Sequence, residues 1–454
     1  MKITSAYKVK IKDYNHIFKD SVSVYRKALD FFIDVCLNEW DNISIIKGIK
    51  NRQSYIESLT VTTGNRPSVK YDFKTADVMF DKFPCYMRRS VINEAIGKVS
   101  SYKSNLSNWE SKDIHTRDNE PSLPKAGNCY PVLYRGNMYQ GDIFTGYEAQ
   151  IKVYRNNTWD WLTVKLHKSD VDYIKHHCQG MKDCCPSLMR KGKQWFLTFS
   201  FMQDVKLNET DIKDQVILAA DLGINNSCTC SVMTSDGTVL RRKFYKLPRE
   251  YDSLNHKIGH IKRAQHHGSH KVTNLWSYAK GINNDIAVKT ANFIIDTAIL
   301  YNVDVIVFEY LDLNKKKKGS HKQKLALWKA RYVQEMVTHK AHVNGMRISH
   351  VNAWGTSKLA YDGSGMTLRG KDANLNSYSL CKFTSGKVYN CDLNASYNIG
   401  ARYFLREILK SLPVRDRQRI EAKVPQCVKR STCTLATLIS LNGVLRSDDL
   451  SYAV

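Results

Sequence analysis

The sequence predicts an α/β chain in which a β-rich unit with a helical insertion precedes a mixed β-sheet with interleaved helices. Two observations predict this arrangement. Apolar residues recur at helical spacing within residues 14–119, and from about residue 120 they alternate with polar ones, as in strands. After residue 214, strands that are apolar on both faces alternate with amphipathic helices, which is typical of a sheet covered on both sides. The 454 residues, 43% of them hydrophobic, are enough for several such cores.

Residues 1–13 and 120–210 are predicted to form the β-rich, barrel-like unit. The first segment, MKITSAYKVKIK, alternates apolar and basic residues, and the stretches IFTGYEAQIKVY and QWFLTFSF alternate in the same way. The run Arg190–Lys193 before the last stretch has the composition of a hairpin turn. Residues 14–119 interrupt this unit with apolar residues at helical spacing and are expected to be a helical insertion.

The region from residue 214 onward has a different order of elements. QVILAAD reads as a buried strand, and it is followed by two further strands, CTCSVMT and TVLRRKF, which the turn Ser235–Gly237 joins. A helix, the strand VDVIVFEY, another helix, the strand MRISHVN and a last helix follow. This is the order of an RNase H-like fold, expected over residues 214–355 and 388–412. Residues 356–387 would be an insertion in it, and residues 413–454 a basic tail without a predicted role.

The charge of the chain points to a polyanionic partner. Lys and Arg number 69 against 43 Asp and Glu, which gives a net charge of +26. Such a surface attracts nucleic acid, and the binding should depend strongly on salt. A membrane surface is disfavoured as a partner, because the charges are spread along the chain and no strongly amphipathic terminal helix is present.

Other features of composition predict a cytoplasmic protein. The most apolar stretch, 286–308, is interrupted by Lys289, Asp296 and Asp304 and is therefore predicted to be a buried helix and strand, not a membrane span. The N-terminus lacks the apolar core of a secretory signal. The twelve cysteines form no short repeating framework, so we expect reduced thiols.

Three carboxylates lie at the ends of predicted core elements. Asp221 ends one apolar strand, Glu309 ends another, and Asp392 begins a helix. Brought to one sheet end, they would repel one another unless cations were bound, and Mg²⁺ prefers such oxygen ligands. Two Mg²⁺ ions, which Mn²⁺ is expected to be able to replace, would support phosphodiester hydrolysis. Because an isolated Asp at a strand end is usually a turn or cap residue, the spacing alone leaves that structural interpretation open.

The local motifs favour the functional interpretation. Asp221-Leu222-Gly223-Ile224-Asn225 resembles the first RuvC motif of the TnpB family, VIVFEYLDL the second, and DLNASYNI, residues 392–399, the third. The resemblance to TnpB and the compact type V CRISPR effectors implies a RuvC nuclease domain preceded by a wedge domain with a recognition insertion. It also implies that residues 356–387 are a target-nucleic-acid-binding insertion, here in a degenerate form that lacks a full zinc site. It also implies that Asp221, Glu309 and Asp392 are metal ligands and catalytic residues.

One departure from the family concerns zinc. The family places a C-x-x-C pair after a Thr-Ser and a second pair before the third motif. Thr356-Ser357 is present here, but the first pair is missing and the second is reduced to Cys381 followed by Thr384. Four soft ligands cannot be assembled from these residues, so we expect no structural zinc. A site that recruits Cys391 or a histidine is left open.

Two basic groups are candidate nucleic-acid contacts. Lys315, Lys316, Lys317 and Lys318 follow the Glu309 strand, and Arg88 and Arg89 lie near the start of a predicted helix. Both groups suit contact with phosphates, although solvated surface charge explains them equally well.

Together the sequence predicts an RNA-guided DNA endonuclease with guide RNA and target DNA as partners, in a prokaryotic, phage or mobile-element setting. The RNA would select the target by pairing, and the protein would recognise a short flanking motif. Two alternatives remain open: an RNase H-like transposase or resolvase that needs no RNA, and a non-cutting RNA-guided repressor.

Overall fold

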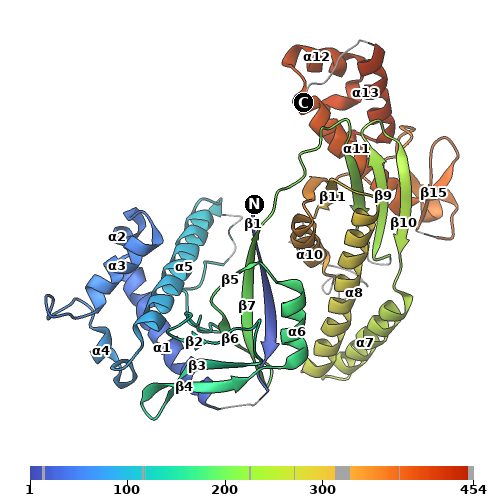
Figure 1. The fold of residues 1–454 in the computed structure, drawn as a ribbon. Helices are drawn as coiled ribbons and strands as arrows, with labels where there is room; N and C mark the ends of the chain where they lie inside the picture. Colours follow the sequence, from blue (N-terminus) through green and yellow to red (C-terminus); the bar gives the residue numbers. More distant parts are fainter. Residues whose placement is uncertain are drawn as a thin grey trace. The chain divides into compact units, whose positions relative to one another are not determined.

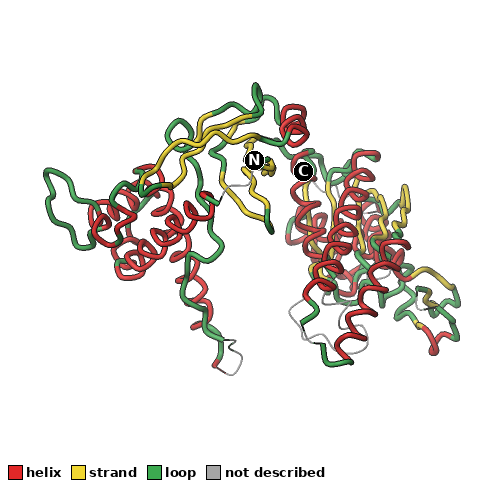
Figure 2. The backbone as a smooth tube through the Cα atoms, turned by 90° about the horizontal axis from the view of Figure 1, so that it is seen from below, coloured by secondary structure: helices red, strands yellow, loops and turns green. Residues whose placement is uncertain are grey.

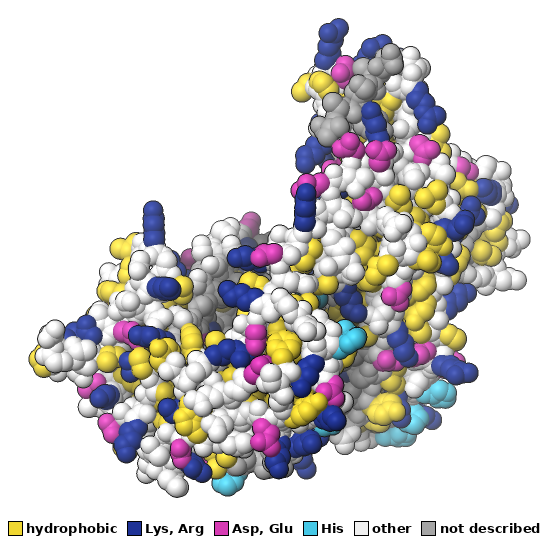
Figure 3. Space-filling model, viewed as in Figure 1, with side chains coloured by type: hydrophobic (Ala, Val, Ile, Leu, Met, Phe, Trp, Pro, Cys, Tyr) yellow, Lys and Arg dark blue, Asp and Glu magenta, His cyan; other side chains and the backbone are white. Residues whose placement is uncertain are grey.

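The structure is a computed structural model that describes residues 1–12, 16–114, 117, 119–223, 226–269, 271–311, 328–377 and 379–447 (Figure 1). The chain divides into two compact units, one of residues 2–203 and one of residues 204–454 together with Met1. None of the described helices is long and apolar enough to cross a membrane. On the face drawn in Figure 3, Lys and Arg side chains are scattered widely among acidic and neutral ones.

The first unit begins with a helical part. Its longest helices are α1 (Ile17–Asn38) and α5 (Cys85–Glu110), which pack against each other. Shorter elements complete it: α2 (Trp40–Ile45), α3 (Ile49–Thr60), α4 (Phe73–Ala76) and the 3-10 turn η1 (Val78–Phe80). Phe73 is buried and stacks on Phe80 with ring centroids 4.5 Å apart, so aromatic packing joins the short elements to α1.

Two small sheets form the rest of this unit. β1 (Lys2–Lys10), β7 (Gln194–Asp204) and β5 (Lys182–Asp183) form one, with β6 (Ser187–Lys191) also paired to β7. β2 (Tyr139–Gln140), β3 (Glu148–Arg155) and β4 (Thr158–Lys165) form the other, and α6 (Lys168–His177) packs on β1. The predicted hairpin turn is confirmed, since β6 and β7 pair across Gly192, whose φ of +61° suits glycine.

The second unit contains a five-stranded sheet in the order β10-β9-β8-β11-β12. Its strands are β8 (Val216–Asp221), β9 (Cys228–Thr234), β10 (Val239–Tyr245), β11 (Val305–Tyr310) and β12 (Arg347–Asn352). β8, β9 and β10 are antiparallel neighbours, whereas β11 runs parallel to both β8 and β12. Strand order and directions are those of an RNase H-like fold, so the predicted fold class is confirmed.

Helices cover both faces of this sheet (Figure 2). Ile217, Ala219, Val305 and Val307 belong to the core that the sheet shares with α11 (Cys391–Ser411). The residues between them pack toward α8 (Thr273–Leu300) and α10 (Ala330–Val343), and α7 (Pro248–His266) packs along α8. Because side chains alternate along a strand, Asp221 and Glu309 continue the rows that face α11.

Two further segments pack around α11. Residues 356–390 include a small sheet of β13 (Leu368–Arg369), β14 (Leu380–Lys382) and β15 (Val388–Asn390), with the 3-10 turn η3 (Gly370–Ala373). Past α11, the chain forms α12 (Val414–Lys423), η4 (Pro425–Val428), η5 (Arg430–Thr432) and α13 (Leu435–Ser447). Leu438 and Leu441 of α13 are buried in the core shared with α11, so this segment, expected as a basic tail, supplies apolar surface to the fold.

Candidate metal-binding active site

Asp221 is the last residue of β8. The β8–β9 register places it opposite Thr229 and directly after the buried Ala219 and Ala220. Its row of side chains faces α11, and the side chain lies at the edge of the core, where it is only partly exposed. The strand therefore delivers a carboxylate to the boundary between the apolar interior and solvent.

Glu309 and Asp392 reach the same sheet end from two other elements. β11 is parallel to β8, so Glu309 near its carboxyl end lies at the edge that Asp221 occupies. Asp392 lies in the first turn of α11, and the Asn390 side chain caps this helix by accepting a hydrogen bond from the Leu393 amide at 2.9 Å. The helix end adds a favourable positive field for a carboxylate there.

The carboxylates of Glu309 and Asp392 act electrostatically on Asp221. Burial and the negative charges of Glu309 and Asp392 raise the pKa of Asp221 well above its usual range, and the Arg369 guanidinium opposes this. Burial also raises the pKa of Glu309, against the opposing effects of a hydrogen bond from Thr356 and the charge of Arg402. The structure thus places Glu309 and Asp392 close enough to Asp221 for their charges to act on it, so that ionisation of Asp221 is unfavourable without a cation.

A second observation also fits a bound cation at this place. The Thr229 hydroxyl, opposite Asp221 in the β8–β9 register, is buried and has no hydrogen-bond partner in the structure. A buried hydroxyl without a partner is costly unless a ligand or water satisfies it. Carboxylates with neighbouring hydroxyl groups are an oxygen donor set that suits Mg²⁺. Among the residues described, however, no group of three or more His, Cys, Asp or Glu side chains is arranged so that it could hold a metal ion, so the three carboxylates do not form a complete ligand cluster in this structure.

Two arginines near the carboxylates were not singled out from the sequence. Arg369 lies on β13 and donates a hydrogen bond to the Ser357 carbonyl. Arg402 lies on α11, is 5% exposed, and donates to four backbone carbonyls, among them those of Asn352 and Trp354 at 2.8 Å each. Neither belongs to a predicted site motif, and the contacts depend on segments distant in sequence.

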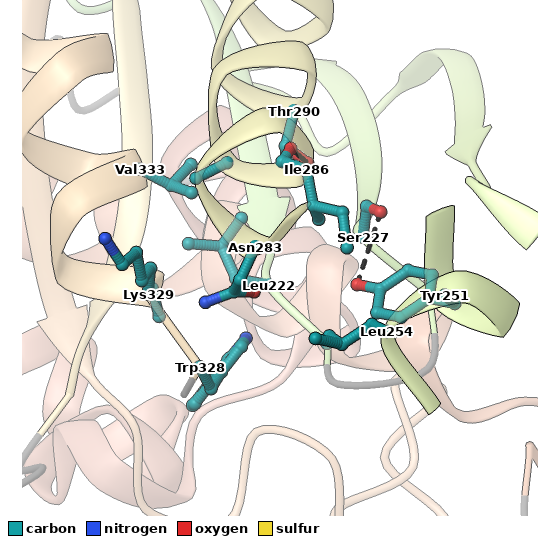
Figure 4. Close-up of a pocket in the computed structure, with 13 residues that line it drawn as sticks. Leu222, Ser227, Tyr251, Leu254, Asn283, Ile286, Thr290, Trp328, Lys329 and Val333 are labelled. Atoms are coloured by element: carbon teal, nitrogen blue, oxygen red, sulfur yellow. Dashed lines mark hydrogen bonds between the residues drawn. The ribbon is translucent and has the colours of Figure 1, made fainter. Parts of the chain in front are cut away.

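A pocket adjoins the strand end of Asp221 (Figure 4). It encloses about 430 Å³, including space open to solvent, and Leu222 and Gly223, the next two residues after Asp221, form part of its wall. Figure 4 shows Ser227 and Tyr251 joined by a hydrogen bond of 3.3 Å on one side and Lys329 on the other. The remaining walls are mainly apolar and come from α7, α8, α10 and the residue Trp328 that precedes α10: Leu254, Asn283, Ile286, Ala287, Thr290, Trp328, Ala330 and Val333.

Of the two predicted groups of phosphate contacts, one belongs to the first unit and the other falls outside the described residues. Arg88 and Arg89 lie on α5 in the first unit, where their guanidinium groups are 3.7 and 3.5 Å from the Glu57 carboxylate. Their charge is thus partly balanced within the protein, and their contact with phosphates stays a prediction. The run Lys315–Lys318 falls within residues 312–327, outside the described part of the chain.

The cysteines near the site are packed as apolar groups. Cys228 and Cys230 lie on one face of β9 with sulfur atoms 3.3 Å apart, and burial raises the pKa of Cys228. Cys381 and Cys391 are buried in the small core of residues 356–391, beside Phe383. The expectation that no structural zinc binds there stays a prediction.

The fold and the grouped carboxylates define an RNase H-like protein with an acidic site, and two kinds of relatives match it. The Aq_aa04 family model matches residues 5–155. The uncharacterized protein aq_aa04 of Aquifex aeolicus is 34% identical over 124 residues, which cover 25% of this chain and 68% of that protein. The TnpB-like protein aq_aa05 of the same organism is 25% identical over 237 residues, covering 46% of this chain and 74% of that protein.

A TnpB-like protein of Methanocaldococcus jannaschii is also 25% identical, covering 40% of this chain and 67% of that protein. Because the match to aq_aa04 covers 68% of that protein at 34% identity, the chain belongs to the Aq_aa04 family. The two TnpB-like relatives confirm the predicted resemblance to TnpB-like proteins.

Among solved structures, a Cas12f1–sgRNA–target DNA complex superposes with a TM-score of 0.33 at 14% identity, over 87% of this chain and 98% of that one. Thermus thermophilus RuvC superposes with a TM-score of 0.22 at 10% identity, over 42% and 96%. At these scores the superpositions add nothing to the fold assignment, which rests on the strand order.

Proposed function

We propose that this protein is an RNA-guided DNA endonuclease that hydrolyses phosphodiester bonds with Mg²⁺, and that Asp221, Glu309 and Asp392 are its metal-binding catalytic residues. One observation carries the proposal: two strands of an RNase H-like sheet and its covering helix bring Glu309 and Asp392 within electrostatic reach of Asp221. A fold gains no stability from grouping three negative charges, so a bound cation explains the arrangement better than packing does.

Each part of the site has a role in this reaction. The three carboxylates hold the metal, and the partly exposed edge of the sheet leaves room for a phosphate beside them. Mg²⁺ bound there would supply the positive charge that activates the attacking water and offsets charge on the leaving oxygen. The Arg369 guanidinium adds a positive charge near Asp221. The same charge would offset the negative charge of a DNA phosphate bound there.

Guide RNA is the second component of the proposal. It rests on the resemblance of the three motifs and on the relatives named TnpB-like. In this proposal residues 1–13 and 120–210 act as the wedge domain, residues 14–119 as the recognition insertion, and residues 214–355 and 388–412 as the nuclease domain. The excess of 26 positive charges would hold RNA and DNA backbones along the chain.

The test has two stages. The chain is purified from cells that carry its native flanking DNA, and any RNA retained after a high-salt wash is sequenced. We expect one discrete RNA with a constant scaffold and a variable end. Random fragments or no RNA would instead support the transposase or resolvase alternative.

The second stage uses a plasmid that contains the sequence of the variable end. We expect Mg²⁺-dependent cleavage by the parent and loss of about a thousandfold or more in Asp221→Ala. Asp236→Ala, in the turn at the opposite end of the sheet, should cleave like the parent. Target binding without cleavage by the parent would support the repressor alternative.

A further inference from the structure

Thr356 makes a contact that connects one candidate metal ligand to another part of the fold. Its hydroxyl donates a hydrogen bond to the Glu309 carboxylate, and the Thr356 side chain is 3% exposed. The same hydroxyl also lies 3.1 Å from the Ala353 carbonyl oxygen. A hydroxyl has one proton to donate, and an ionised carboxylate is a stronger acceptor than a backbone carbonyl, so the contact with Glu309 is favoured.

The backbone of Thr356 is fixed in turn by α11. The Asn398 side-chain amide donates to the Thr356 carbonyl at 2.9 Å and to the Leu359 carbonyl at 2.8 Å. Asn394, one turn earlier, donates to the Leu359 carbonyl at 2.8 Å and accepts a hydrogen bond from the Tyr361 amide at 2.8 Å. Both asparagines are fully buried, where side-chain amides are retained only if their hydrogen bonds are satisfied.

Arg402 fixes the other side of the same loop. It donates to the carbonyls of Asn352 and Trp354, which precede Thr356, and to those of Ser431 and Cys433 from the segment before α13. The carbonyls of residues 352, 354, 356 and 359 are therefore all bonded by side chains of α11. The loop from β12 to residue 359 is held along its length by one helix.

That helix also carries Asp392, two residues before Asn394. We infer that Thr356 is a positioning residue, which orients the Glu309 carboxylate through its hydroxyl so that α11 sets the geometry of Asp392 directly and of Glu309 indirectly. This inference rests on the proposed function, since it assigns Thr356 a role only if Glu309 binds a metal. Groups that orient a metal ligand in this way typically change metal affinity or activity about 10- to 100-fold when they are removed.

The experiment compares Thr356→Val, which keeps the shape but loses the hydroxyl, with Thr356→Ser, which keeps the hydroxyl. Mn²⁺ binding to the full-length protein is measured by electron paramagnetic resonance, and the Mg²⁺ dependence of cleavage is measured in parallel. We expect Thr356→Val to weaken Mn²⁺ binding about 10- to 100-fold and to raise the half-saturating Mg²⁺ concentration. Thr356→Ser should stay close to the parent in both measurements.

Thr238→Val is the matched control, because Thr238 also donates a hydrogen bond to a carboxylate, that of Asp236, at the opposite end of the sheet. It should leave Mn²⁺ binding unchanged. If Thr356→Val proves too unstable to purify, Thr356→Ala is compared with Thr356→Ser in its place.

Two different negative results are distinguishable. If Asp221→Ala abolishes cleavage and weakens Mn²⁺ binding while the hydroxyl-free Thr356 variant binds Mn²⁺ like the parent, the positioning role is wrong and the proposed function stands. A lower melting temperature with unchanged Mn²⁺ affinity likewise rules out the positioning role. The hydroxyl would then only stabilise the local turn, through its hydrogen bond to the Ala353 carbonyl. If Asp221→Ala changes neither measurement, the proposed function itself fails.

Discussion

At the scale of single residues, the grouping of carboxylates that suits metal binding lowers the stability of the metal-free protein. Asp221, partly buried beside two other carboxylates, has a raised pKa, whereas an ordinary exposed aspartate ionises near pH 4. Below that pH the group is protonated in both the folded and the unfolded chain. As the pH rises through the raised pKa of the folded state, ionisation favours unfolding, so metal-free protein loses stability.

We therefore predict that Asp221→Asn raises the melting temperature in the presence of a chelator, and more so at pH 8 than at pH 4. Mg²⁺ should stabilise the parent but not this variant. Differential scanning fluorimetry over this pH range measures both effects. An equal difference between variant and parent at the two pH values would contradict the predicted linkage.

Asp236 provides a control, because the pH dependence of its contribution to stability has the opposite sign. Burial raises its pKa, but hydrogen bonds from Thr234 and Thr238 outweigh this effect and leave the pKa lowered. Its ionised form therefore stabilises the fold above about pH 4, and this contribution is lost as the pH falls. Asp236→Asn should lower the melting temperature at pH 8 and have less effect at the acidic end.

At the scale of the elements, the placement of Asp392 depends on how closely α11 approaches the sheet. Gly400 lies on the face of α11 that packs against β8 and β9, and a β-carbon there would be 2.6 Å from the Met233 sulfur and 3.3 Å from the Ala219 β-carbon. The absence of a side chain lets the helix lie directly on the strand that ends in Asp221. The distance between Asp221 and Asp392 is thus coupled to one glycine.

Gly400→Ala is expected to destabilise the protein by up to about 2 kcal/mol, because an overpacking cost of about 1–3 kcal/mol exceeds the gain of about 1 kcal/mol in helix propensity. Chemical denaturation measures the change, and cleavage should fall with it as α11 moves away from β8. Gly443→Ala in α13 is the matched control, since a β-carbon there would meet nothing within 4 Å. That change should be neutral or stabilising, and an equally neutral result for Gly400→Ala would show that the close contact is not required.

At the scale of the whole molecule, charge governs partner binding and the cores govern folding. The 69 basic residues are distributed over both units, whereas each unit has apolar cores of its own. Contacts with nucleic-acid phosphates release counterions, so their number determines how steeply affinity falls with salt.

If six to ten phosphates are neutralised, affinity should fall about 10³- to 10⁵-fold between 50 and 200 mM salt. Fluorescence anisotropy with a labelled duplex measures this dependence, using Asp221→Asn so that the DNA is not cut. Charge-neutral labelled dextran serves as the control and should not bind at any salt concentration. A nearly salt-independent affinity for DNA would refute electrostatic binding.

The sequence by itself determined the order of strands and helices in the second unit, because burial on both faces leaves apolar runs and amphipathic helices leave periodic ones. It also determined Asp221, Glu309 and Asp392 as candidates, since each ends or begins a core element within a recognisable motif. Side-chain contacts across long sequence separations were decided only by the tertiary structure. The hydrogen bond from Thr356 to Glu309, the four carbonyls bonded by Arg402, and the packing of α13 on α11 join segments tens of residues apart, and no local pattern records such pairs. The strand ends place the carboxylates at one edge of the sheet, whereas only the folded arrangement of α11 determines how they are held there.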